Sequence, residues 1–171
     1  PNHRQVAQEF ATLLKTAQSK TADKKSRAKA YYQAAVRLRS QGLVFTGYEM
    51  TPDYAIYDAH YSYLSDAFNT QDLQHKSWIS VAEAARASKA LPAAENRFLH
   101  YRWQAVALAQ KAADLLPPKS QTYAAVLCNA AGWVIARDAK SSRALYQRYI
   151  KNGTQYSWAH NFGYHCPMPE F

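Results

Sequence analysis

Apolar residues recur at helical spacing through most of this chain, and this periodicity restricts the fold more than any other feature. In the first segment, Val6, Phe10 and Leu13 fall on one helical face. Only five of the 171 residues are glycine, and proline or short polar stretches interrupt the pattern at intervals. The sequence therefore predicts an all-α fold. We expect seven helices, at about 2–18, 22–41, 52–68, 71–90, 93–116, 121–136 and 141–151.

Several helix ends can be assigned from single residues. Gly42 is placed to end the second helix, and Gly153 to end the last one. Ser120 can cap the helix that comes after it. The helix predicted at 121–136 is apolar on nearly all sides, which is typical of a helix at the centre of a fold.

The C-terminal tail, 154–171, lacks helical periodicity but is rich in aromatic residues. Disordered segments are poor in aromatic residues, so we expect the tail to be extended and docked on the helices. Cys128 and Cys166 allow one disulfide bond, and two buried thiols are an equal alternative. His160, His165 and Cys166 are zinc-ligand types, but their spacing matches no recognised finger. A docked tail with a buried cysteine is therefore preferred over a zinc site.

Charge is distributed unevenly along the chain. Residues 44–75 contain five acids, five tyrosines and no Lys or Arg, whereas 1–43 and 76–171 are basic. The acidic segment carries −5 and each flank +7, which gives the net charge of +9. A chain this basic can bind nucleic acid, anionic lipid or an acidic protein. The acidic segment indicates a surface that meets a partner, and the change of sign also allows self-association between copies.

Seven residues are candidates for contacts with a partner. Tyrosine is enriched at protein interfaces, and two tyrosines of the acidic segment fall outside the apolar stripe that the others form. A second group lies early in the long predicted helix, where arginine beside aromatic rings suits a carboxylate or a nucleic-acid base. The alternatives are core packing for the tyrosines and a solvated helix face for the basic group. The candidates are Tyr48, Glu49, Tyr63, Arg97, His100, Arg102 and Trp103.

The sequence carries no motif for catalysis. It has no nucleophile elbow, phosphate-binding glycine loop or metalloprotease pattern. Glu49, Asp53, Asp58 and His60 lie close in sequence, but Asp53 and Asp58 are five residues apart and do not share a helical face. Cys128 lies in an apolar helix rather than in the electropositive setting of a reactive cysteine. We therefore predict no catalytic, cofactor-binding or metal-binding residues.

The segment 123–151 resembles a tetratricopeptide-type helical hairpin. Its Ala131-Gly132 pair, with Ile135 three residues on and Ala144 twelve after the glycine, falls where that family has small and apolar packing residues. The resemblance implies a short α-solenoid of stacked antiparallel hairpins. It also implies a close approach of two helices at the glycine, and a concave groove that binds peptides or protein segments.

We therefore expect one helical-repeat domain over 1–171 that acts as a non-catalytic scaffold for a protein or peptide, bound in a groove of basic and aromatic residues. Two other classes stay open: a binder of nucleic acid or anionic surfaces, and a helical enzyme domain acting on a cell-envelope glycan. The enzyme would need two carboxylates facing each other across a cleft. No apolar run is long enough to span a membrane, so we expect a soluble protein of the cytoplasm or periplasm. Because the chain starts at Pro1 without Met, we expect a fragment or processed form of a longer protein.

Overall fold

The computed structural model describes residues 2–46, 80–82, 85 and 100–171. The chain divides into two compact units, one comprising residues 1–48 with 98–171 and the other comprising 49–97. Nearly all described residues belong to the first unit. The single domain predicted over 1–171 stays a prediction.

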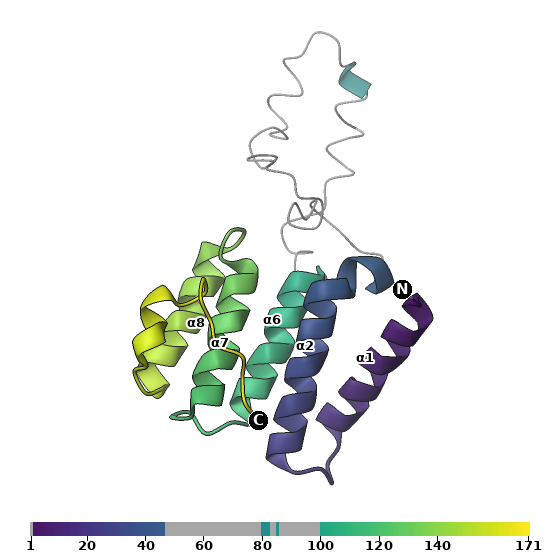
Figure 1. Cartoon of the computed structure of the whole chain (residues 1–171). Helices are drawn as coiled ribbons and strands as arrows, with labels where there is room; N and C mark the ends of the chain where they lie inside the picture. Colours follow the sequence, from purple (N-terminus) through teal and green to yellow (C-terminus); the bar gives the residue numbers. More distant parts are fainter. Residues whose placement is uncertain (1, 47–79, 83–84, 86–99) are drawn as a thin grey trace. The chain divides into compact units, whose positions relative to one another are not determined.

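Five α-helices form the described part of this first unit (Figure 1). No strand occurs in the described ranges, so the predicted all-α class is confirmed there. The helices predicted at 52–68 and 71–90 lie outside the described residues. A short 3-10 helix, Ser157–Asn161, lies in the C-terminal tail. The five helices are α1 (His3–Gln18), α2 (Lys24–Thr46), α6 (Tyr101–Asp114), α7 (Gln121–Val134) and α8 (Ala139–Asn152).

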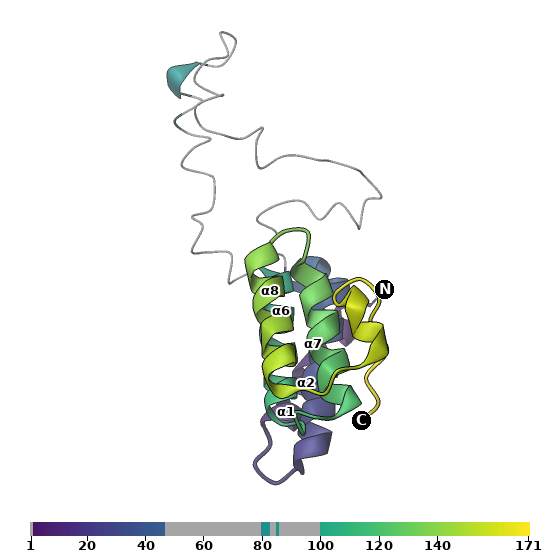
Figure 2. The ribbon, with the colours of Figure 1, turned by 90° about the vertical axis from the view of Figure 1, so that its left-hand side faces the viewer.

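The helices pack side by side in a row, and each contacts the next in the order α1, α2, α6, α7, α8. Neighbouring helices run in opposite directions (Figures 1 and 2). α2 and α6 are neighbours in this row although residues 47–100 separate them in the sequence. They therefore pair like the two arms of an antiparallel hairpin.

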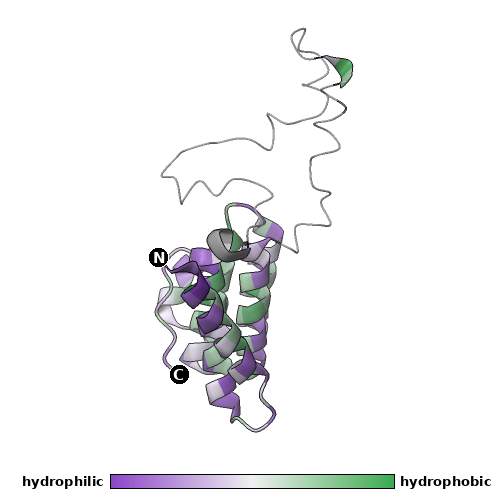
Figure 3. Ribbon diagram, turned by 90° about the vertical axis from the view of Figure 1, so that its right-hand side faces the viewer, coloured by the Kyte–Doolittle hydropathy of each residue, from purple (hydrophilic) through white to green (hydrophobic). Residues whose placement is uncertain are grey.

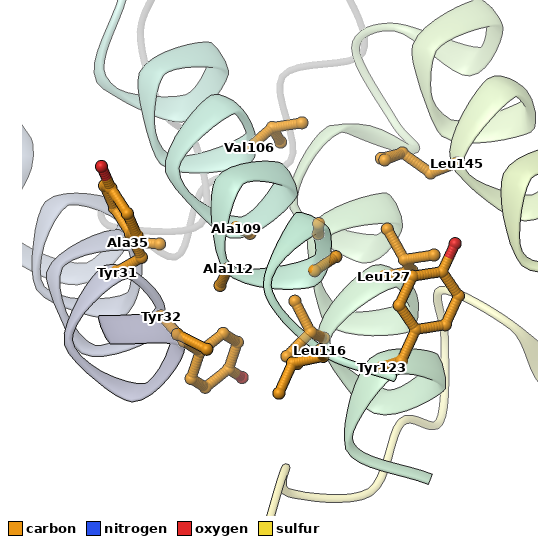
Figure 4. Close-up of a cluster of buried hydrophobic side chains, with 14 of the residues drawn as sticks. Tyr31, Tyr32, Ala35, Val106, Ala109, Ala112, Leu116, Tyr123, Leu127 and Leu145 are labelled. Atoms are coloured by element: carbon orange, nitrogen blue, oxygen red, sulfur yellow. The ribbon is translucent and has the colours of Figure 1, made fainter. Parts of the chain in front are cut away.

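The core of the row is rich in alanine, which allows close packing of helices. Ala35 of α2 and Ala109 of α6 are completely buried, and Leu127 and Leu145 fill the space between the last three helices (Figure 4). In α7, the six consecutive residues 123–128 are each at most 2% exposed. α7 is therefore deeply buried, as its apolar sequence predicts, although it is the fourth helix of the row; α6, α8 and the C-terminal tail contact it. Hydrophilic residues prevail on the outward side of the helices (Figure 3).

Gly42 does not end the second helix, because α2 continues to Thr46. Gly42 is buried, and a Cβ atom at this position would lie 2.6 Å from the Cβ atom of Tyr101 on α6. The glycine is therefore explained by close contact between two helices rather than by a helix end. Tertiary packing has overridden the local stop signal.

The helix predicted at 93–116 is interrupted at His100, and α6 begins at Tyr101. Residues 93–99 lie outside the described residues. His100 is extended and is the N-cap: its Nδ1 atom accepts the backbone N–H of Arg102 at 3.1 Å. Histidine is an uncommon cap, which is why the sequence pattern did not show this boundary. The helix then ends at Asp114, close to the predicted end.

Other predicted helix ends are confirmed. Ser120 caps α7 by accepting the backbone N–H of Tyr123 at 3.1 Å. Gly153 comes directly after α8 and donates its N–H to the carbonyl of Tyr149 at 2.7 Å. α8 starts two residues before its predicted start, because Asp138 accepts the N–H of Ser141 and caps the helix.

The C-terminal tail is docked on the helices, as predicted, and a disulfide bond between Cys128 of α7 and Cys166 holds it there. From the sequence alone, a disulfide bond and two buried thiols were both possible. Asn129 adds a hydrogen bond to the carbonyl of Pro167 at 3.0 Å. The hydroxyl of Thr122 also donates to the carbonyl of Glu170. The tail therefore runs along α7, with contacts spread over its length.

Gly132 allows the C-terminal tail to approach α7 closely. The tetratricopeptide resemblance had implied a close approach of two helices at this glycine. A Cβ atom on Gly132 would lie 2.4 Å from the carbonyl oxygen of Gly163. Gly163 itself has φ +87°, a left-handed conformation that glycine adopts without strain. The two glycines together let the backbone of the tail lie directly on α7.

Candidate binding groove

An open groove with a volume of about 750 Å³ lies between α1 and α2 and meets the C-terminal tail. One face of each helix lines the groove, so the lining residues recur at helical spacing. Ten of the lining residues come from the two helices, and the tail supplies the eleventh. The lining residues are Gln5, Gln8, Glu9, Thr12 and Leu13 of α1, Tyr32, Gln33, Val36, Arg37 and Ser40 of α2, and Met168.

α1 is buried most deeply near the turn that joins it to α2. Ala17 is the one fully buried residue of α1, and its carbonyl accepts a hydrogen bond from Nε of Arg27 at 3.1 Å. Nearer the N-terminus, Val6, Phe10 and Leu13 are only half-buried. The N-terminal half of α1 still contacts the fold through Phe10, which packs against Leu38 and Tyr101, and the groove lies beside these contacts.

Part of the groove lining is apolar and exposed. Val36 is 39% exposed and Met168 is 77% exposed, while Leu13 is half-buried. Binding of a partner that covers large apolar side chains in a groove lowers the free energy, because apolar surface is removed from water. Methionine suits such a position, because its flexible thioether adapts to different partner side chains.

An ion pair between the two helices lines the groove. Arg37 of α2 lies 2.6 Å from Glu9 of α1, and both side chains are about 40% exposed. Gln5 donates to the same carboxylate at 3.0 Å, and Arg37 also donates to Gln41 at 3.3 Å. An exposed pair of this kind stabilises a fold by at most about 1 kcal/mol. The charged groups of this pair and the neighbouring glutamine amides can form hydrogen bonds with a bound chain.

Tyr32 connects the groove to the rest of the fold. Its ring lies 6.1 Å from the ring of Trp133 on α7 and 5.7 Å from the ring of Phe171, the last residue of the tail. Burial raises the pKa of Tyr32 to about 12, so its hydroxyl stays neutral at physiological pH. The tail is thus fixed at Cys166 and packed at Phe171, with Met168 between these two points.

Three predicted contact residues form a buried cluster at the start of α6. His100 is 1% exposed and Arg102 is 7% exposed. Arg102 donates to the carbonyl of Trp133 at 3.0 Å, near the negative end of the α7 dipole. Trp103 donates its indole N–H to the carboxylate of Asp138 at 3.0 Å. These contacts join α6 to the α7–α8 connection, and they place the three side chains away from the groove.

The other predicted contact residues, Tyr48, Glu49, Tyr63 and Arg97, lie outside the described residues. The groove residues were missed, although one signal for them was available. The apolar stripe of the first helix contains one large residue per turn and is flanked by glutamine and threonine, which is typical of a helix at the edge of a fold. The contribution of Met168 depends on the path of the tail and has no such signal.

The groove has no arrangement for metal binding or acid–base catalysis. Within the described ranges, no three His, Cys, Asp or Glu residues gather as metal ligands. Glu9 is the single carboxylate among the lining residues, and it is paired with Arg37. The acids Asp53 and Asp58 lie outside the described residues.

A search of protein-family models, curated proteins and solved structures found no significant match to this chain. Within the described residues, no helix combines the length and the apolar character needed to cross a membrane.

Proposed function

We propose that this helical unit is a non-catalytic scaffold that binds an acidic, apolar-anchored peptide segment of another protein in the groove between α1 and α2. The observation that carries the proposal is the open groove of about 750 Å³ with Val36 and Met168 exposed along it. A volume of this size lies within the range of about 300–1,000 Å³ that is typical of ligand-binding clefts. The tetratricopeptide-like character inferred from the sequence is part of the same proposal, and the row of antiparallel helices supports it.

The charge of the unit selects an acidic partner. The described residues include seventeen Lys and Arg but only five Asp and Glu. This excess attracts acidic segments and accelerates their encounter with the groove. The affinity itself would come from apolar anchors that cover Leu13, Val36 and Met168. The glycan-enzyme alternative has less support, because the groove has one carboxylate rather than two facing each other.

The test uses a random library of 12-residue peptides displayed on phage and selected on the full chain. We expect enrichment of acidic peptides that carry two or more apolar or aromatic residues. A Val36→Glu variant should weaken binding of the selected peptides at least tenfold, because it adds a like charge to the groove. The matched control is Ile150→Glu on α8, where a 47% exposed aliphatic residue lies away from the groove.

Selected peptides that bind wild type and Val36→Glu equally would contradict the groove as the binding site. Enrichment of basic peptides, or no enrichment, would contradict the proposed partner chemistry. Helical circular dichroism of both variants should match wild type, since both substitutions lie at exposed helix positions.

We also infer that the protein works in an oxidising compartment, which favours the periplasm over the cytoplasm. The inference rests on the disulfide bond between Cys128 and Cys166, because such bonds persist outside the reducing cytosol. Protein purified from its source under alkylating conditions should carry no alkylated cysteine. Two alkylated cysteines per chain would contradict the inference.

A further inference from the structure

Exposed lysines gather at one end of the row of helices, which we call the lysine end. This end holds the α1–α2 turn, the α6–α7 turn and the C-terminus of α8, because neighbouring helices alternate in direction (Figure 1). The surface is thus formed by segments far apart in the sequence. All its lysines are exposed, and in the described part of the chain none of them is in an ion pair. They are Lys15, Lys20, Lys24, Lys25, Lys111, Lys119 and Lys151.

Helix stability accounts for some of these lysines but not for all. Lys111 and Lys151 lie in the last turns of α6 and α8, where a cation complements the helix dipole. Lys24 and Lys25 are the first two residues of α2, where a cation opposes the dipole, and no acid occupies that first turn. A placement that disfavours the local helix needs another reason, and binding of an external anion supplies one.

Three acids lie at this end, against seven lysines: Asp23, Asp114 and the exposed Glu170, whose backbone carbonyl accepts a hydrogen bond from Thr122 near the start of α7. Asp23 accepts the backbone N–H of Ser26 and acts as the cap of α2. Asp114 is 2.6 Å from Arg148 and is therefore already paired. The lysine end thus presents a positive surface across three separate segments.

We propose that the lysine end docks on a bilayer that contains anionic phospholipids. Charge complementarity is the first argument, since clustered lysines beside an anionic bilayer each add to binding. The residue type is the second, because nucleic-acid surfaces typically use arginine forks and aromatic stacking. At this end Arg27 donates to the carbonyl of Ala17 and Arg148 pairs with Asp114, which leaves lysines as the exposed cations. Pro117 and Pro118, exposed beside Lys119 in the α6–α7 turn, add uncharged surface at the same end.

Docking by this end would leave the groove accessible. The groove residues span 5–13 of α1 and 32–40 of α2, whereas the lysine end is centred on the turn between Gln18 and Lys24. The proposal therefore does not depend on the proposed function. A failure of one leaves the other standing.

The test compares two triple variants of the full chain that have equal net charge. One combines Lys20→Gln, Lys24→Gln and Lys25→Gln at the lysine end. The control combines Arg4→Gln, Lys140→Gln and Arg143→Gln, three exposed cations that lie outside it. Binding is measured by co-sedimentation with vesicles of phosphatidylcholine alone and of phosphatidylcholine with phosphatidylglycerol, at low and at physiological salt.

Wild type should bind only the vesicles that contain phosphatidylglycerol, and more weakly as salt rises. The lysine-end variant should lose about 100-fold in partitioning, at about fivefold per lysine, while the control stays near wild type. Equal losses in both variants would overturn the proposal, because net charge alone would then explain the binding. Binding of a short DNA duplex with no binding to the anionic vesicles would overturn it in favour of a nucleic-acid surface.

Discussion

Gly132 shows how one residue can depend on a segment that lies far from it in the sequence. It lies in a helix, where alanine would be favoured by about 1 kcal/mol if nothing else contacted it. The carbonyl of Gly163 occupies the space that a Cβ atom would need, at 2.4 Å. The requirement for glycine therefore comes from the docked tail and not from the helix.

We predict that Gly132→Ala destabilises the oxidised protein by about 1–3 kcal/mol, because the tail backbone must shift. Urea unfolding monitored by circular dichroism measures the change. The control repeats the substitution in a Cys166→Ser background, where the tail can move away and the penalty should fall or reverse. An equal penalty in both backgrounds would contradict the role assigned to the tail.

Asp23 should make the stability of the protein depend on pH in the acidic range. Hydrogen bonds from the side chain and backbone of Ser26 lower the pKa of the Asp23 carboxyl below its usual value of 3.8. A group with a depressed pKa in the folded state contributes stability above its unfolded pKa, and this contribution disappears as pH falls through the folded pKa. Wild type should therefore exceed Asp23→Ala in stability at neutral pH.

The difference between wild type and Asp23→Ala should vanish when pH falls well below 3.8. Unfolding midpoints measured across this range test the prediction, with Asp114→Ala as a control for the loss of an unrelated acid. A difference that persists unchanged at low pH would show that Asp23 does not act through its charged form.

At the scale of elements, most helices could be predicted from the sequence because their signals are local. The apolar periodicity and the caps at Ser120 and Gly153 depend on neighbours within one turn. The predicted helix boundaries were wrong where contacts with residues distant in the sequence determine the local structure. Gly42 lies within α2 and packs against Tyr101 of α6, and α6 starts at Tyr101 after the cap His100, beside contacts to the α7–α8 connection.

The tail was predicted to dock because of its aromatic content, but the disulfide bond and the ring contacts that hold it could not be predicted. Cys128 and Cys166 are 38 residues apart, and no pattern in the sequence distinguishes a disulfide bond from two thiols. The ring contacts of the tail also had no local signal. Phe162 packs on Tyr149 of α8 at 5.0 Å between ring centroids, which only the folded chain shows.

Breaking the disulfide bond should destabilise the unit by about 2–4 kcal/mol, since the bond closes a loop of this length in the unfolded chain. The change is Cys166→Ser, and the measurement is the midpoint of urea unfolding. Wild type treated with a reductant should approach the variant, and the variant itself should not respond to the reductant. An unchanged midpoint in reduced wild type would contradict a stabilising role for the bond.

At the scale of the whole molecule, the candidate contacts predicted from the sequence that the structure describes do not line the groove. Of these, Arg102 and Trp103 pack inside the unit, where they hold α6 to the α7–α8 connection. The groove depends on how far α1 is separated from α2 and on where the tail passes. Neither the separation of the helices nor the path of the tail can be read from a short stretch of sequence, so the groove is identified only from the structure.

The uneven charge was readable from the sequence, but its arrangement in space was not. Lys20 and Lys119 are about a hundred positions apart, and the alternating directions of the helices bring their turns to one end. The groove lies further along α1 and α2, at residues 5–13 and 32–40. The two proposed binding surfaces, the groove for an acidic peptide and the lysine end for an anionic bilayer, are thus formed by different residues.

Met168 provides the most direct test of the groove as a binding site. The chain contains only two methionines, so selective ¹³C labelling of methionine methyl groups gives two signals, and Met168→Leu assigns the one from the groove. On addition of a peptide selected from the library, we predict that the Met168 methyl signal shifts in a saturable manner, and that Val36→Glu abolishes the shift. A peptide that binds while the Met168 signal stays unchanged would show that the groove is not the binding site.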